Sequence, residues 1–74
     1  MSTRNTLIEI VAEYRNIPAE KVKTDVSFGE MGLDSLDVAE LLLKVEEEMH
    51  VVLEPSPEYD TIDKLAQYLE QQGA

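Results

Sequence analysis

The chain has 74 residues, the size of one small domain, and 43% of them are hydrophobic. Its formal net charge of −10, from sixteen Asp and Glu against six Lys and Arg, argues against nucleic acid as a partner and for proteins with basic surfaces. There is no cysteine, which excludes disulfides and thiolate metal sites, and no apolar run approaches the roughly 20 residues that cross a bilayer. We expect a single cytoplasmic domain over residues 1–74 with no membrane insertion.

The first predicted helix begins after a polar start, where Ser2 or Thr3 can cap it, and runs to Arg15. Its apolar residues recur at helical spacing and are Leu7, Ile8, Ile10, Val11 and Tyr14. The sequence at 16–18 ends the helix, because the residue before a proline avoids the helical region. The proline can open a short helical turn over residues 18–22.

Residues 23–31 show no hydrophobic period and include several turn-forming residues, which predicts a loop. Val26 and Phe28 are the apolar residues that can anchor it. We expect Phe28, the only phenylalanine of the chain, to lie in the core.

A serine stands where this loop gives way to the next helix. Asp34 or Ser35 can cap that helix, and Gly32 supplies backbone freedom just before it. A serine at a helix start is ordinarily only a cap. A phosphate attached to Ser35 would nevertheless lie where unpaired amides and the helix dipole favour an anion.

The central helix is predicted from Ser35 or Leu36 to about Met49. Its broad apolar face comprises Val38, Leu41, Leu42, Val45 and Met49. Leu36 and Leu43 fall toward the opposite side, among acidic residues. Apolar residues surrounded by charge are typical of a contact surface, although a plain solvated face is the alternative for the carboxylates.

The segment 50–53 is apolar and is compatible with an extended chain or with more helix, and Pro55 and Pro57 then enforce a break. Residues 56–60 can hold a short helical turn. Thr61 is a suitable cap for the last helix, which ends before Gly73. The buried stripe of that helix is Ile62, Leu65, Ala66 and Leu69.

These elements predict an all-α fold, a small four-helix bundle of three longer helices and a short one, with the longer helices packed nearly antiparallel. The predicted core is Leu7, Val11, Phe28, Leu42, Val45, Ile62, Leu65 and Leu69.

Catalysis is not expected. The only histidine, His50, lies at the far end of the helix that Ser35 begins, which is roughly 20 Å away at a rise of about 1.5 Å per residue. Proton transfer needs contact at about 3 Å, so the two residues cannot form a hydrolase pair. One histidine without cysteine argues against a zinc site, and the ligand pattern of a calcium loop is missing. We expect neither an enzyme nor a metal protein.

The run Gly32-Leu33-Asp34-Ser35-Leu36-Asp37, followed by Glu40, resembles the prosthetic-group attachment motif of acyl carrier proteins. Val26-Ser27-Phe28 upstream and residues 45–49 downstream are also similar to that family, so the resemblance spans nearly the whole chain. It implies a 4′-phosphopantetheine arm, transferred from coenzyme A by a phosphopantetheinyl transferase and joined to Ser35 through a phosphodiester. The thiol of the arm would carry acyl groups as thioesters.

The same resemblance implies how the carrier meets its partners. These would be the transferase together with acyl synthases, ketosynthases and acyltransferases that have basic docking patches, and the carrier itself would be a monomer. The implied recognition surface is Asp34, Leu36, Asp37, Glu40, Leu43, Glu46 and Glu47. The implied lining of a cavity for the acyl chain is Phe28, Leu42, Val45, Leu53, Ile62 and Leu65.

Three departures leave the pathway open between fatty acid, polyketide and specialised lipid synthesis. The segment 50–53 is less acidic than is usual in fatty-acid carriers, Lys44 interrupts the acidic face, and residues 59–65 resemble carriers of polyketide and nonribosomal peptide systems. The short flanks favour a free-standing carrier. The alternatives are a peptidyl or aminoacyl carrier, such as a D-alanyl carrier, and an unmodified acidic helical adaptor that binds a basic partner.

Overall fold

A computed structural model describes residues 2–54 and 56–72, so Pro55 and Gly73, on which two of the predictions rest, lie outside the described residues. It contains three α-helices, α1 (Thr3–Arg15), α2 (Ser35–Met49) and α3 (Ile62–Gln71), and two 3-10 turns, η1 (Ala19–Lys21) and η2 (Pro57–Tyr59). The only extended pairing in the described part of the chain is an isolated bridge between Ser27 and Thr61. The predicted all-α class is therefore confirmed, with 3-10 turns as the short elements.

The helix boundaries follow from local capping, as the sequence predicts. Ser2 accepts a hydrogen bond from the N–H of Asn5 at 3.1 Å and begins α1. Asn16 ends it in the left-handed conformation, with φ of 57°. Thr61 accepts from the N–H of Lys64 at 3.0 Å and begins α3. Each cap gives an otherwise unpaired terminal group a partner.

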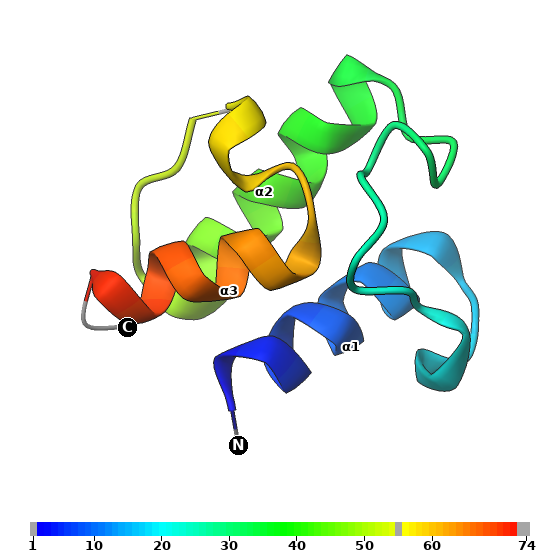
Figure 1. Cartoon of the computed structure of the whole chain (residues 1–74), viewed down its shortest axis with the longest axis horizontal. Coiled ribbons are helices and arrows are strands. Elements are labelled where there is room, and N and C mark those ends of the chain that lie inside the picture. The colour runs from blue at the N-terminus through cyan, green and yellow to red at the C-terminus, as the bar shows by residue number, and fades with distance from the viewer. Residues whose placement is uncertain (1, 55, 73–74) are drawn as a thin grey trace.

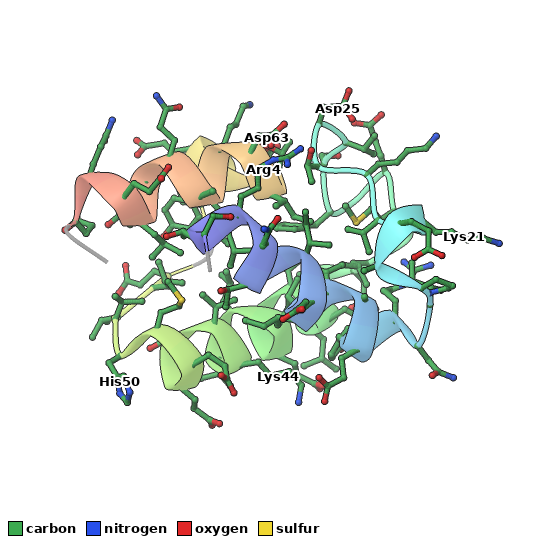
Figure 2. The ribbon with its side chains drawn as sticks, turned by 90° about the horizontal axis from the view of Figure 1, so that it is seen from below. Arg4, Lys21, Asp25, Lys44, His50 and Asp63 are labelled. Carbon is green, nitrogen blue, oxygen red and sulfur yellow. The ribbon has the colours of Figure 1, made fainter. Side chains whose placement is uncertain are left out.

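The directions of the helices differ in part from the prediction. In both views α1 runs opposite to α2 and to α3, but α2 and α3 run in the same general direction (Figures 1 and 2). Near-antiparallel packing is thus correct for α1 against each neighbour and wrong for α2 against α3. The reason is the connection after His50, which carries the chain back toward the start of α2, where Phe28 donates its N–H to the carbonyl of Asp60 at 2.8 Å.

The core lies between the three helices and the two long connections, of which the first comprises residues 16–34 and the second residues 50–61, described except for residue 55. All eight residues predicted for it are buried. The long connections add buried side chains that periodicity did not predict, namely Leu33, Leu53 and Tyr59. Phe28 anchors the first connection at 3% exposure, whereas Val26 is only half-buried. Among the described helices, none is long and apolar enough to span a bilayer.

Candidate functional site

The start of α2 is held by a reciprocal pair of aspartates. Asp34 is the N-cap, and its Oδ1 accepts the N–H of Asp37 at 2.9 Å. The Oδ2 of Asp37 in turn accepts the N–H of Asp34 at 3.2 Å. This capping box settles the choice between Asp34 and Ser35 that the sequence left open, and it leaves the hydroxyl of Ser35 free of the cap. The spacing of three residues between Asp34 and Asp37 is the sequence signal of this capping box, and the sequence analysis did not use it.

The turn before this pair is fixed by backbone hydrogen bonds and by a buried leucine. Gly32 has φ of +92°, which glycine adopts without strain, and its N–H donates to the carbonyl of Gly29 at 3.0 Å. The N–H of Leu33 donates to the carbonyl of Phe28 at 3.1 Å, and the Leu33 side chain is 7% exposed. The chain therefore enters α2 along a defined path.

Ser35, the first residue of α2, is exposed. His50 is the C-cap at the opposite end of the same unbroken helix, also exposed, with φ of 57°. Figure 2 shows the imidazole projecting from that end of the molecule. The two residues are about 22 Å apart along the axis at about 1.5 Å per residue, too far for proton transfer. Ser35 is thus accessible to an external reagent and lacks a histidine base.

Metal ligands do not gather in the described part of the chain, since no cluster of three or more His, Asp and Glu side chains there could hold an ion. The acidic residues of α2 are instead spread along the helix.

The hydroxyl of Tyr14, on α1, meets two carboxylates of α2. It donates to Asp37 Oδ1 at 3.0 Å and lies 3.3 Å from Glu40 Oε2. Partial burial, the hydrogen bond to Asp37 and the negative charges of both carboxylates raise the pKa of Tyr14 from 10.0 to about 12. The sequence had placed Tyr14 only in the apolar stripe of α1, because periodicity does not report where a hydroxyl ends.

Four residues of the predicted recognition surface form one stripe of α2. Leu36, Glu40, Leu43 and Glu47 follow one another at intervals of three or four residues, which places them on one helix face. All four are exposed, and the two leucines expose 66% and 56% of their surface. The remaining members flank this stripe: Asp34 is exposed, and Asp37 and Glu46 are half-buried.

A hollow of about 240 Å³ lies between α2, the first connection and η2. Two of the residues predicted to line an acyl cavity, Phe28 and Leu42, border it. Val38 and Tyr59 also border it and were not predicted. The hollow begins one helical turn after Ser35, because Val38 is three residues further along α2.

The other four residues predicted for that lining are buried in the closed core. They are Val45, Leu53, Ile62 and Leu65, with exposures of 1%, 6%, 0% and 1%.

Comparison with known proteins gives a consistent result. The family described as "Phosphopantetheine attachment site" matches residues 5–69. An acyl carrier protein of Bdellovibrio bacteriovorus is 35% identical over 68 residues, covering 88% of this chain and 87% of that protein. One of Phaeodactylum tricornutum is 39% identical, covering 86% and 88%. A mitochondrial acyl carrier protein of Dictyostelium discoideum is 38% identical, covering 82% of this chain and 50% of its own length.

Proposed function

This chain belongs to the phosphopantetheine-attachment family that includes the acyl carrier proteins, and we propose that Ser35 bears its 4′-phosphopantetheine arm. It is a carrier and not an enzyme. The observation that carries the assignment is that Ser35 is an exposed first helical residue whose hydroxyl the capping box leaves free. When bound, the arm supplies the thiol that this cysteine-free chain lacks.

The local structure suits an arm that extends away from the protein. The amide N–H groups of Ser35 and Leu36 find no acceptor among the described residues, so they favour an anion at this helix start. The carboxylates of Asp34, Asp37 and Glu40 repel the negative charge of the phosphodiester. This repulsion disfavours an arm that folds back onto the start of α2. The linkage would therefore be anchored at the serine while the arm remains free to reach partner enzymes.

The stripe of Leu36, Glu40, Leu43 and Glu47 supports docking by acyl-handling enzymes. Exposed leucines supply apolar contact area, and the carboxylates attract basic patches on the partner. Such attraction acts over about 8–10 Å at physiological salt, which raises association rates without fixing a permanent complex. Within this proposal, the phosphopantetheinyl transferase, acyl synthases, ketosynthases and acyltransferases bind this face in turn, and the carrier acts as a monomer.

The hollow beside Val38 is the place where an acyl chain would begin to enter. Phe28 and Leu42 give it an apolar floor, and it opens close to Ser35. Filling it requires no rearrangement of the deeper core. A longer chain would have to part α2 from η2 and reach the buried residues Val45 and Leu53, which a marginally stable small domain can do at modest cost.

Fatty acid synthesis is the pathway that we favour, because proteins named acyl carrier protein from bacteria, and one named mitochondrial, are among the relatives that match over most of this chain. Polyketide or specialised lipid synthesis and aminoacyl carriage differ in what is loaded rather than in the fold. Loading assays with a malonyl donor and with amino acid donors, D-alanine among them, would separate acyl carriage from aminoacyl carriage.

The test is the intact mass of the protein before and after incubation with coenzyme A and a broad-specificity phosphopantetheinyl transferase. We expect the parent to gain one phosphopantetheine and Ser35→Ala to gain none. Ser2→Ala, which removes another exposed helix-start serine, is the matched control and should be modified as the parent is. An unmodified parent, under conditions that modify a known carrier, would return Ser35 to an ordinary helix position and favour the unmodified acidic adaptor.

A further inference from the structure

Tyr14 connects α1 to the segment that carries Ser35. Its hydroxyl donates to one oxygen of Asp37 at 3.0 Å, across a separation of 23 residues. The other oxygen of the same carboxylate accepts the N–H of Asp34 at 3.2 Å. Tyr14 is therefore one hydrogen bond from the capping box and two from the residue that precedes Ser35.

The carboxylates that Tyr14 meets form no ion pair with the residues that the structure describes. The ion pairs found among the described residues join Arg4 to Asp63 and Lys64 to Asp60, so neither Asp37 nor Glu40 takes part in one. Like charges three residues apart on a helix repel each other. The phenol, which is protonated at neutral pH, donates to Asp37 and lies 3.3 Å from Glu40, so it places a hydrogen-bond donor between the two carboxylates.

We propose that Tyr14 is a positioning residue for the modification of Ser35. By holding Asp37 in the rotamer that reaches back to Asp34, it keeps the capping box closed and presents the serine and the neighbouring carboxylates to the transferase in one arrangement. This inference rests on the proposed function of Ser35, and Tyr14 itself touches neither the arm nor coenzyme A.

Loss of the hydroxyl would act on recognition rather than on the chemical step. Without it, Asp37 is free to rotate away from Asp34, and the first turn of α2 samples more conformations. The transferase must then select the competent fraction, so its apparent affinity for the carrier falls in proportion to that fraction. Once bound, the serine reacts as before. The KM for the apo carrier rises, while kcat changes little.

The first measurement compares apo wild type, Tyr14→Phe and Tyr68→Phe as substrates of the transferase, with coenzyme A saturating. Tyr68 is the matched control, because it is also half-buried and its hydroxyl makes no hydrogen bond to the described residues. Its ring packs on that of Tyr59, with the two ring centroids 4.7 Å apart. We expect the KM for Tyr14→Phe to rise about threefold to tenfold, the range that one hydrogen bond to a carboxylate can give at a partly exposed site. Amide chemical shifts of Asp34 and Ser35 should move in Tyr14→Phe and not in Tyr68→Phe.

A double-mutant cycle shows whether Tyr14 acts through Asp37. In an Asp37→Ala background the further change Tyr14→Phe should leave the KM within about 1.5-fold, because the connection is already broken. In a Glu40→Gln background, where Asp37 remains, Tyr14→Phe should keep its full effect. Equal effects in both backgrounds would overturn the inference in favour of a general packing role for Tyr14.

The outcomes separate the two proposals. If wild type is modified and Tyr14→Phe matches it in KM and in the amide shifts of Asp34 and Ser35, the positioning role is wrong and the function of Ser35 stands. If wild type is not modified under conditions that modify a known carrier, the proposed function fails, and the positioning role fails with it.

Discussion

Arg4 and Asp63 lie 2.9 Å apart, from Arg4 Nε to Asp63 Oδ1, although 59 residues separate them in the chain (Figure 2). The same guanidinium donates to the hydroxyl of Thr24 at 2.9 Å, and that hydroxyl donates to the second oxygen of Asp63 at 3.2 Å. One small network thus joins α1, the first connection and the first turn of α3. Figure 2 shows the network on the side of the molecule opposite to His50.

This network predicts a modest loss of stability in Arg4→Ala. Both charged side chains are about half exposed, so we expect the free energy of unfolding to fall by about 0.5–1 kcal/mol. Urea unfolding measures it. Lys21→Ala is the control, because this substitution also removes one positive charge, and Lys21 makes no ion pair with the described residues. Equal losses in the two variants would mean that net charge, rather than the contact, is responsible.

The capping box predicts different consequences for two adjacent alanine substitutions. Asp34→Ala removes the cap and should lower the free energy of unfolding by about 0.5–2 kcal/mol. Ser35→Ala removes an exposed hydroxyl that the cap does not use and should change it by less than about 0.5 kcal/mol. Urea unfolding of both variants, in the apo form, checks the order. A larger loss for Ser35→Ala would show that the serine is the cap in solution.

The raised pKa of Tyr14 predicts a pH dependence of stability with a definite sign. Between the unfolded value of 10.0 and the folded value of about 12, the folded state holds a proton that the unfolded state has lost. The stabilising contribution is therefore complete below pH 10 and is lost as the pH rises toward 12. The difference in unfolding free energy between wild type and Tyr14→Phe should shrink over that window. A constant difference would contradict the assignment, and tyrosinate absorbance follows the titration directly.

Charge reversal separates docking from folding at two neighbouring positions. Glu40→Lys should weaken binding to a basic partner, measured as the KM of the transferase at low salt, with only a small change in unfolding free energy. Asp37→Lys should weaken partner binding and also lower the free energy of unfolding, because Asp37 closes the capping box. Glu70→Lys makes the same charge change at an exposed site on α3. If Glu70→Lys weakens binding as much as Glu40→Lys, the recognition surface does not lie on α2.

The hollow beside α2 predicts that a larger residue at its border blocks entry of the acyl chain. In wild type, longer acyl groups on the arm should raise the free energy of unfolding, measured by urea titration, by at most about 0.8 kcal/mol for each methylene that is buried. Val38→Phe fills the hollow and should remove this dependence on chain length. Val52→Phe, at a position 84% exposed, is the control and should retain it. A chain-length effect that survives in Val38→Phe would place the acyl group elsewhere.

Much of the fold was predictable, because its determinants are local. Hydrophobic spacing of three and four residues located the three helices, and the cap at Ser2, the break at Pro18 and the cap at Thr61 set most of their ends. The motif around Ser35 was equally local. These features depend on residues only a few positions apart, so they can be recognised within a short stretch of sequence.

The tertiary structure decided what long separations control. The reach of Tyr14 to Asp37, the hollow bordered by Val38 and Tyr59, and the common direction of α2 and α3 all depend on how distant segments pack. Helical periodicity reports which face is buried and gives no information on which other segment covers it. The sequence alone therefore determined the helices and the serine at the start of α2, and packing determined the surroundings in which that serine is presented.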